Sequence, residues 1–324
     1  MPTTVTGARP LPNAVARLVA TRLTPDLRAE GRMLSGRVRS VHRAAIYLDV
    51  GSSPSHLPAS QAIVAIDDVG GVPGGILVGN IGDLRETGIR PGMAVVPSIR
   101  GLALPSAGVE IDLADALSWS PTLPAAARFR PTPELGGIVA AARRLAAIHA
   151  SPGGLAWTIP GAVRTADPWQ ARAALLIDRQ LAALESGDPV AAAADAAKAT
   201  VELIGLGVGL TPSGDDYLVG LLAGLEATDD PVRQGLAATI AAHAEIRTTA
   251  VAAAALGHAA SGAFVERLHD VLVAVGRGRL DGLEPAIERA MAYGSTSGGD
   301  TLVGLFCALD LALARSTRAP AVAA

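Results

Sequence analysis

Cysteine is almost absent from the sequence, and this absence limits the chemistry of any metal or redox site. The 324 residues contain a single cysteine, Cys307. One thiol cannot form a disulfide within the chain or supply a cysteine-rich metal site. Cys307 lies in an apolar stretch, where a free cysteine usually packs as a small buried hydrophobic residue, and we interpret it in that way.

Aromatic side chains are also scarce, at 3% of residues, although hydrophobic residues make up 50%. The chain is long enough for one large domain or two ordinary ones, each with its own hydrophobic core. We therefore expect a core built from Ala, Leu and Val rather than from large rings. Such a core favours close packing of helices.

Excess positive charge is missing as well. The formal net charge is −3, and no Lys/Arg stripe is interleaved with aromatic residues. We therefore expect no nucleic-acid partner. Three arginines interrupt the apolar positions of the first 23 residues, so no signal-peptide core stands out. No run approaches about 20 strongly apolar residues, and the longest candidate, 248–264, consists mostly of small ones. We expect a soluble cytoplasmic protein with no membrane partner.

The hydrophobic pattern divides the chain into segments. Residues 1–30 form an N-terminal segment in which 11–30 predict a short amphipathic helix. Residues 31–122 contain short β-branched runs separated by Gly, Pro, Ser and Asp, which predict a β-rich and mostly antiparallel domain. Residues 123–315 have helical periodicity and many alanines, and 316–324 form a flexible tail. The predicted fold class is therefore α+β, with a β-rich N-terminal domain followed by an Ala-rich helical domain.

A glycine-rich motif in the helical part occurs twice. Residues 205–226 read GLGVGLTPSGDDYLVGLLAGLE, and residues 295–312 read STSGGDTLVGLFCALDLA. The Ser-Gly-x-Asp phrase that starts at Ser213 returns 84 positions later at Ser297. Each copy predicts a turn followed by a helix. We treat this internal repeat as the organising feature of the chain.

The first copy has features of an anion site. Its glycines allow positive φ and consecutive N–H groups, and a helix that starts near Gly214 would direct its positive end to the same place. A phosphate or carboxylate would bind there. The motif matches neither a P-loop, since no Lys follows, nor the dinucleotide fingerprint, since the preceding segment is helical. The predicted substrate-binding residues are Gly207, Gly209, Thr211, Ser213, Gly214, Ser297 and Gly298.

Helix capping is an alternative explanation for part of the motif. Ser213 with Asp216, and Ser297 with Asp300, have the spacing of a capping box, in which the serine caps the helix and the acid reaches back. Capping could explain both pairs without any ligand. It does not explain the three glycines, the additional Asp215 or the recurrence of the turn.

Small residues four apart follow each turn, namely Gly220 and Gly224 in one copy and Gly304 and Ala308 in the other. Glycine inside a helix costs about 1 kcal/mol relative to alanine, so we expect close packing of the two helices to compensate. Their N-termini would then converge on one cleft.

Three acidic residues would meet in that cleft. We predict Asp215, Asp216 and Asp300 as catalytic carboxylates that orient an amide or transfer a proton. Asp215 and Asp216 could also bind a metal ion, with Mg²⁺ as the possible cofactor.

Arg247, Thr248 and Thr249 follow between the two copies. An arginine beside two hydroxyls can hold a carboxylate or phosphate, and we predict Arg247 and Thr248 as substrate-binding residues. A solvated arginine with two ordinary threonines is the alternative. His258 and Ser261 lie 11 and 14 positions after Arg247, so all three could share one helical face. No Ser-His-Asp arrangement or metal-binding histidine pair emerges.

The segment GLGVGLTPSGDDYLVGLLAGL, followed by RTT and then GSTSGGDTLVGL, resembles the AllH-type subunit of oxamate carbamoyltransferase, a family also called domain of unknown function 2877. Upstream, the resemblance is limited to SVHRAAIYLDV and the region IVAIDDVGGVPGGILV. It implies a role in anaerobic purine and allantoin degradation. There, a three-component enzyme interconverts oxalurate plus phosphate with oxamate plus carbamoyl phosphate.

The chain lacks the Ser-Thr-Arg-Thr-Arg phosphate loop of ordinary transcarbamoylases, so we take the glycine loop at 205–214 as the candidate carbamoyl-phosphate site. The resemblance implies other subunits of a carbamoyltransferase complex as partners, and a homo-oligomer is possible.

Two functions from different classes remain open. The chain is either a catalytic component that acts on a small carboxylate or carbamoyl compound, or a noncatalytic assembly or regulatory subunit. In the second case the repeated Ser-Gly-x-Asp turns would be structural helix caps.

Overall fold

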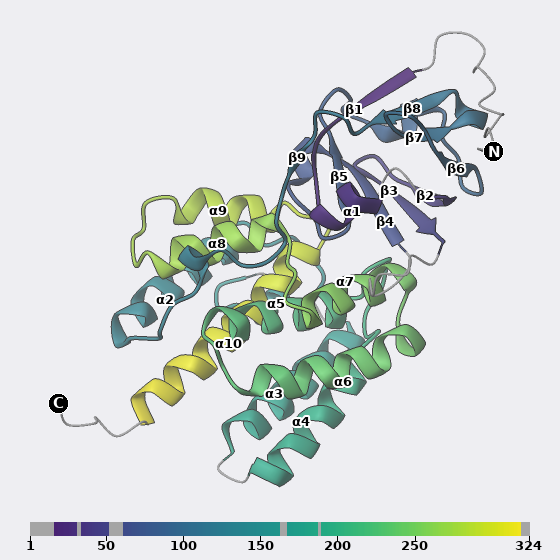
Figure 1. Ribbon diagram of the computed structural model, residues 1–324. Coiled ribbons are helices and arrows are strands. Elements are labelled where there is room, and N and C mark those ends of the chain that lie inside the picture. The colour runs from purple at the N-terminus through teal and green to yellow at the C-terminus, as the bar shows by residue number, and fades with distance from the viewer. Residues whose placement is uncertain (1–15, 31–33, 52–60, 163–166, 187–188, 319–324) are drawn as a thin grey trace, which may run out of the picture. The chain divides into compact units, whose positions relative to one another are not determined.

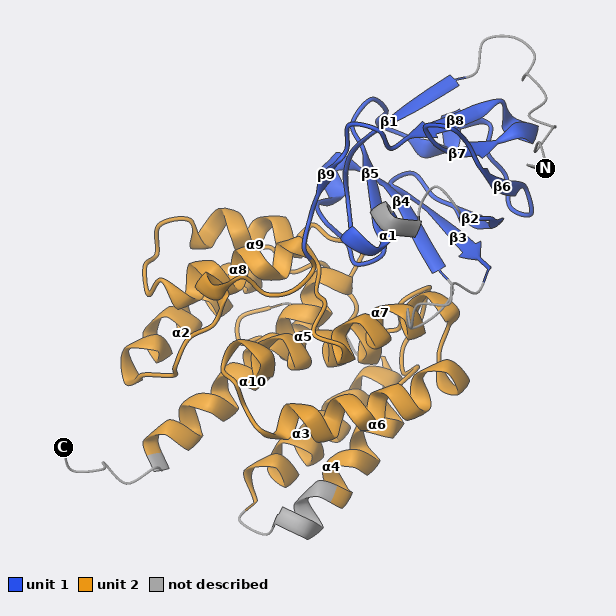
Figure 2. Cartoon of the chain, viewed as in Figure 1, with its two compact units in different colours: residues 1–120 blue, residues 121–324 orange. Residues whose placement is uncertain are grey.

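The chain folds into two compact units, residues 1–120 and 121–324 (Figure 2). The computed structural model describes residues 16–30, 34–51, 61–162, 167–186 and 189–318. The first unit contains the strands and the second contains the long helices, which confirms the α+β class. The unit boundary lies between Ser120 and Pro121, close to the boundary predicted after residue 122.

A nine-stranded sheet forms the first unit (Figure 1). Its order is β5-β4-β3-β2-β6-β7-β8-β1-β9, and β5 also pairs with β1, so the sheet closes on itself. The pairs β1–β8, β1–β9 and β4–β5 are parallel and the other described pairs are antiparallel, as the sequence predicted for most of them. The strands are β1 Ala16–Leu23, β2 Gly36–Val41, β3 Ala45–Val50, β4 Gln61–Ile66, β5 Gly75–Val78, β6 Ala94–Pro97, β7 Gly101–Leu104, β8 Val109–Asp112 and β9 Leu117–Ser118. Short helices α1 Pro25–Glu30, η1 Asp67–Val69, η2 Leu84–Thr87 and η3 Pro105–Ala107 lie between them.

The N-terminal segment corrects one prediction. Of the helix expected over 11–30, residues 11–15 lie outside the described part of the chain, 16–23 form strand β1, and a helix covers only Pro25–Glu30. Backbone pairing with β5, β8 and β9 decides the conformation of β1. Tertiary context of this kind outweighs the weak helical periodicity of so short a segment.

Nine α-helices and two short 3₁₀ turns form the described part of the second unit. The turns are η4 Ala125–Ala127 and η5 Ala156–Thr158. The helices are α2 Pro133–Ile148, α3 Pro168–Glu185, α4 Pro189–Leu203, α5 Ser213–Ala227, α6 Val232–Arg247, α7 Ala250–Ala260, α8 Glu266–Gly276, α9 Leu283–Met291 and α10 Ser297–Arg318. Their shared core consists largely of Ala, Leu, Ile and Val, as the scarcity of aromatic residues predicted.

Helices α5 and α10, which begin in the two copies of the repeat, lie side by side in the middle of this unit (Figure 1). A methyl group on Gly220 would overlap the carbonyl oxygen of Thr301, and one on Gly304 would overlap that of Tyr217. The two contacts are equivalent under the repeat, because residues 217 and 220 lie 84 positions before residues 301 and 304. The predicted close packing through small residues is therefore confirmed.

Helix α10 combines length with an apolar composition. Over residues 297–317 it is long and apolar enough to cross a membrane, although 72% of its most apolar window is buried inside the protein. The sequence had pointed to 248–264 as the longest apolar candidate, but the helix there, α7, covers only 11 residues. We therefore interpret α10 as a core helix, which packs against α5 and is buried by the rest of the helical unit.

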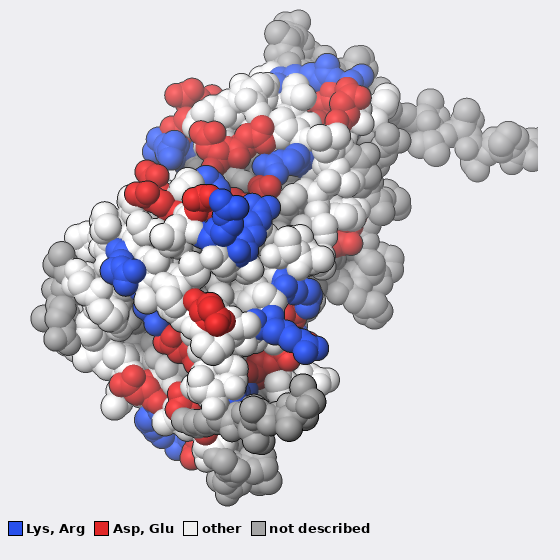
Figure 3. Space-filling model, turned by 90° about the vertical axis from the view of Figure 1, so that its left-hand side faces the viewer, with Lys and Arg blue, Asp and Glu red and all other residues white. Residues whose placement is uncertain are grey.

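Acidic and basic side chains are interspersed on the surface. The face in Figure 3 shows both signs close to one another. Several pairs bridge separate helices of the second unit, among them Arg143–Asp310 and Arg289–Asp270. The small net charge of the whole chain, −3, thus results from 27 basic and 30 acidic residues that nearly cancel.

The contact between α5 and α10 can be tested with two glycine substitutions. We expect Gly220→Ala to lower the free energy of unfolding by about 1 to 3 kcal/mol, because the added methyl group overlaps backbone that cannot move cheaply. The matched control is Gly235→Ala on the exposed side of α6, where an added methyl group meets nothing. There we expect a gain of about 0.5 to 1 kcal/mol from helix propensity. Urea unfolding measures both, and a neutral Gly220→Ala would contradict the packing described.

Candidate functional site

The starts of α5 and α10 meet inside the second unit. The hydroxyl oxygens of Thr211 and Ser297, 86 positions apart in sequence, lie 3.0 Å from each other. The predicted convergence of the two helix N-termini is therefore confirmed. Ser213, Asp216 and Asp300, which lie at the same junction, are buried, whereas Thr211 and Ser297 themselves are half-buried.

Both copies of the repeat close their turns in the same way. The amide of Gly214 donates to the carbonyl of Leu206 at 2.8 Å, and the amide of Gly298 donates to that of Tyr293 at 2.9 Å. Neither glycine has room for a side chain, because each packs against a backbone carbonyl of the preceding helix end. In this structure these two amides are therefore already used by the chain itself.

The glycine loop has the conformation that the sequence predicted. Gly205, Gly207 and Gly209 have φ values of 79°, 128° and 96°. Gly207 lies against the first amide of α5, so a methyl group on it would stand 2.6 Å from Ser213 N, whereas Gly209 faces open space. The close approach of the α5 backbone thus explains why residue 207 is a glycine. No neighbouring atom requires a glycine at 209. The anion-binding role of the loop remains a prediction.

The capping-box interpretation is wrong for α5. The N-cap residue is Pro212, whose side chain offers no cap, and Ser213 is already the first helical residue. Each serine instead interacts with the aspartate of the other copy. The hydroxyl of Ser297 lowers the pKa of Asp216, and the hydroxyl of Ser213 lowers the pKa of Asp300. Helix α5 begins at Ser213 itself, whereas a capping serine would stand just before the first helical residue. The two serine hydroxyls therefore connect α5 with α10 and do not cap their own helices.

Asp216 and Asp300 form a buried carboxyl pair at this junction. They are 7% and 0% exposed, and Asp300 Oδ1 accepts a hydrogen bond from the amide of Leu155. The second oxygen of each, Oδ2, is buried without a hydrogen-bond partner among the described residues. Unpaired buried oxygens of this kind are costly, by about 1 to 3 kcal/mol each, and call for an explanation.

Burial also changes the acidity of the pair. It raises the pKa of Asp300 to about 6, against the hydrogen bond from Leu155 that lowers it. Burial raises the pKa of Asp216 well above its ordinary value, and the negative charge of Asp300 raises it further. Both carboxyls therefore retain protons at a pH where ordinary aspartates are fully ionised.

Asp215 has a different environment. Its Oδ1 accepts from the amide of Gly205 at 3.0 Å, and its Oδ2 accepts from the hydroxyl of Thr248 at 2.6 Å. Burial raises its pKa to about 6, while these two hydrogen bonds lower it. Both oxygens are thus occupied, and Asp215 ties the glycine loop to the connection after α6. Its predicted catalytic role finds no free oxygen in this structure.

Arg247 ends α6 with its side chain exposed, and no acidic group of the described chain pairs with it. Thr249 caps α7 by accepting from Ala252 N at 3.1 Å, and its hydroxyl donates to the Leu210 carbonyl. The helix breaks between Arg247 and Ala250, so His258 lies on α7 and Ser261 is the C-cap residue of that helix. The expectation that they share one helical face with Arg247 is wrong.

No cluster of three or more His, Cys, Asp or Glu side chains within the described ranges is arranged to hold a metal ion. Asp215 uses both oxygens for hydrogen bonds, and Asp216 has one unpaired oxygen. A Mg²⁺ ion at Asp215 and Asp216 therefore remains a prediction with only one unpaired oxygen to support it.

One contributor to the site, Leu155, and one contact between two predicted residues, Thr211 and Ser297, were not foreseen from the sequence. The amide of Leu155 reaches Asp300 across 145 positions, and Thr211 lies against Ser297 across 86. Leu155 belongs to a segment without any motif, so no local signal could have found it. The partner of Thr211 could have been guessed only by placing the two repeat copies face to face.

One comparison with known proteins gives a match. Residues 203–309 match the family model described as oxamate carbamoyltransferase subunit AllH, which confirms the resemblance for this part of the chain. The matched segment contains both copies of the repeat and about a third of the sequence. No curated protein and no solved structure matches the chain significantly.

The raised pKa of Asp300 predicts a pH dependence of stability. In the unfolded chain an aspartate ionises near pH 4, whereas burial raises the pKa of Asp300 to about 6 in the folded protein. Between these values the folded state binds more protons, so the free energy of unfolding falls as the pH rises from about 4 to about 6. We expect Asp300→Asn to remove a decline on the order of 1 to 3 kcal/mol.

Urea unfolding at several pH values between 4 and 7 measures this effect as the difference between variant and parent. Asp195→Asn, at an exposed position on α4, is the matched control and should leave the decline unchanged. Parallel pH profiles for the parent and Asp300→Asn would show that Asp300 titrates normally.

Proposed function

We propose that this chain, whose residues 203–309 match the AllH family, is a subunit of an oxamate carbamoyltransferase in which Asp216 and Asp300 act on the reacting nitrogen. The family match supports the subunit role. The observation that carries the catalytic part is the pair of buried Oδ2 atoms without partners. A substrate N–H would supply the hydrogen bonds that these two oxygens lack.

The chemistry suits a pair of carboxyls with raised pKa. When the amide nitrogen of oxamate attacks the carbonyl carbon of carbamoyl phosphate, a C–N bond forms, the C–O bond to phosphate breaks, and the nitrogen gives up a proton. A carboxylate of raised pKa accepts that proton more readily than an ordinary one. Its protonated neighbour donates to the phosphate oxygen that leaves. Asp216 and Asp300 would share these two roles.

We assign the anionic groups of the substrates to the surrounding loop. Arg247 is exposed and unpaired within the described chain, and it would hold a carboxylate or phosphate together with Thr248. Gly207, Gly209 and Gly214 would supply backbone amides. This requires the loop to release the Gly214 amide from Leu206, so the site closes differently when substrate is present.

Partner subunits are part of the proposal. Three large apolar side chains around this loop and the end of α6 are exposed, namely Val208 at 73%, Leu210 at 42% and Ile246 at 82%. Exposed apolar groups next to a site are typical of surfaces that other chains cover. They support an active site that is completed by other subunits. A cytoplasmic location remains a prediction.

A noncatalytic subunit is the second candidate, and the burial of the carboxyls favours it. Asp216 and Asp300 are closed off from solvent, and Asp215 has only internal partners. In that case the two carboxyls would hold the helix starts together by sharing a proton, with no ligand between them. The packing of α5 against α10 would then be the purpose of the repeat.

Calorimetric titration of the full chain with carbamoyl phosphate, oxamate and oxalurate, with and without Mg²⁺, separates the two candidates. For a catalytic subunit we expect saturable binding of at least one compound. Asp216→Asn should weaken that binding about 10-fold or more, because an amide NH2 in the place of Oδ2 is a donor and cannot accept the hydrogen bond from the substrate N–H.

Asp195→Asn, on the exposed side of α4, serves as the control and should bind like the parent. Binding that is identical in the parent and in Asp216→Asn would remove the carboxyl pair from the substrate site. Absence of any binding by the parent, together with a changed unfolding free energy in Asp216→Asn, would favour the noncatalytic subunit.

A further inference from the structure

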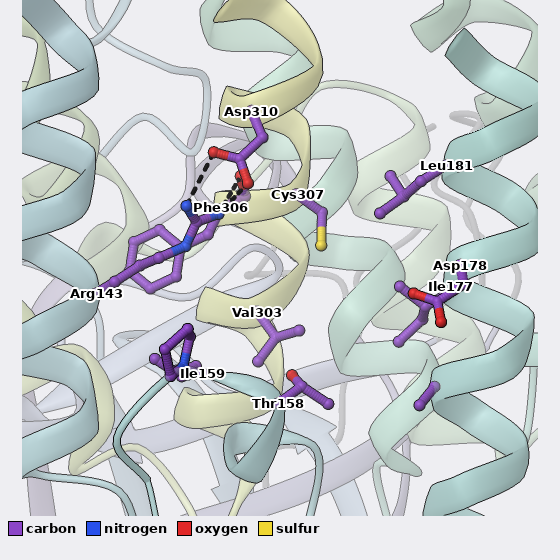
Figure 4. A pocket seen from close by; sticks show the side chains of 12 residues that line it. Arg143, Thr158, Ile159, Ile177, Asp178, Leu181, Val303, Phe306, Cys307 and Asp310 are labelled. Carbon is purple, nitrogen blue, oxygen red and sulfur yellow. Dashed lines mark hydrogen bonds and ion pairs between the residues drawn. The ribbon is translucent and has the colours of Figure 1, made fainter. Parts of the chain in front are cut away.

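A second feature of the helical unit lies apart from the carboxyl pair. A cavity of about 310 Å³ opens between α3 and α10 (Figure 4). Its volume is at the lower end of those that bind small molecules. The proposed carbamoyl chemistry assigns nothing to it. The residues that line it are Arg143, Thr158, Ile159, Pro160, Ala174, Ile177, Asp178, Leu181, Val303, Phe306, Cys307 and Asp310.

The cavity exists because two matching helix faces are held apart. Four lining residues from α3 and four from α10 follow the same spacing of i, i+3, i+4 and i+7, which places each set on one face of its helix. Faces of this kind usually pack directly against each other. Here Arg143 from α2 and the segment 158–160 form further walls, and space remains between them. The two sets are Ala174, Ile177, Asp178 and Leu181, and Val303, Phe306, Cys307 and Asp310.

The positive charge at one side of the cavity is already neutralised. Nη1 of Arg143 donates to Asp310 Oδ1 at 2.9 Å, and Nη2 donates to Asp310 Oδ2 and to the Phe306 carbonyl. The guanidinium also lies over the Phe306 ring, 5.3 Å from its centre. An incoming anion would have to displace these contacts (Figure 4).

The negative charge at the other side is not neutralised. Asp178 projects from α3 opposite the Arg143–Asp310 pair, its side chain is exposed, and no basic group of the described chain pairs with it (Figure 4). Cys307 stays uncharged, because burial raises the pKa of its thiol to about 12. The lining therefore carries one unbalanced negative charge beside a mainly apolar wall.

We infer that this cavity binds a small organic cation, an ammonium or guanidinium group carried on a short apolar chain. The cation would pair with Asp178, and the chain would lie against Ile159, Ile177 and Val303. A carboxylate or phosphate compound is disfavoured, because Asp178 repels it and Arg143 is engaged. The inference does not depend on the proposed function, since none of these residues belongs to the carboxyl pair.

Ligand-observed NMR titration of the full chain with n-butylammonium, and with butyrate as its anionic counterpart, tests the inference. We expect saturable binding of n-butylammonium and none of butyrate. Asp178→Asn should weaken the binding about 3-fold or more, and raising the salt concentration should weaken it in the parent. Ala174→Leu, which fills the cavity and keeps Asp178, should weaken it independently of charge.

Asp195→Asn is the control, since it removes an exposed carboxylate of the neighbouring helix α4 without touching the cavity. Equal binding of butyrate, an unchanged affinity in Asp178→Asn and Ala174→Leu, or the same loss in Asp195→Asn would each overturn the inference. So would the absence of saturable binding of n-butylammonium. Because Asp216 is unaltered in these variants, the outcome leaves the test of the proposed function untouched.

Discussion

The backbone contact between α5 and α10 is the constraint on which the helical unit depends. Gly220 and Gly304 each leave room for a carbonyl of the other helix, so the axes come closer than any side chain would permit. That closeness brings the first turns of both helices together and buries the side chains that stand there. The acidity of Asp216 and Asp300 therefore follows from a packing requirement that lies one to two helical turns away from them.

Exchange of partners between the repeat copies lets polar residues be buried at this junction. A serine that capped its own helix would leave Asp216 with only the hydroxyl of Thr211, and Asp300 with only that of Thr296. Because Ser213 serves Asp300 and Ser297 serves Asp216, each carboxyl gains a partner and each helix start is tied to the other. One oxygen of each carboxyl, Oδ2, still has no hydrogen-bond partner among the described residues. A contact with a purely structural role would leave no such oxygen, so the unpaired atoms are the reason to consider a ligand site here.

The sequence predicted the contacts that the repeated motif marks and missed those that no motif marks. Glycines inside helices are costly, so Gly220 and Gly304 indicate close packing by their positions in the sequence alone. The spacing of Ser213 and Asp216 suggested a cap, yet the helix begins at Ser213 itself, a difference of one residue that local pattern cannot resolve. The Leu155 contact and the cavity beside α3 bring together residues that are more than 100 positions apart, and no motif marks them.

The duplication has a consequence for any molecule that would sit between the two unpaired oxygens. Residues related by the repeat are arranged about a pseudo-twofold axis, so an asymmetric guest placed on that axis could lie in either of two opposite directions. Asp215 breaks this equivalence, because the corresponding position in the second copy is Gly299. The glycine loop, Thr248 and Arg247 all lie on the Asp215 side. A molecule bound between the two carboxyls would therefore meet two unlike sides and be held in one orientation.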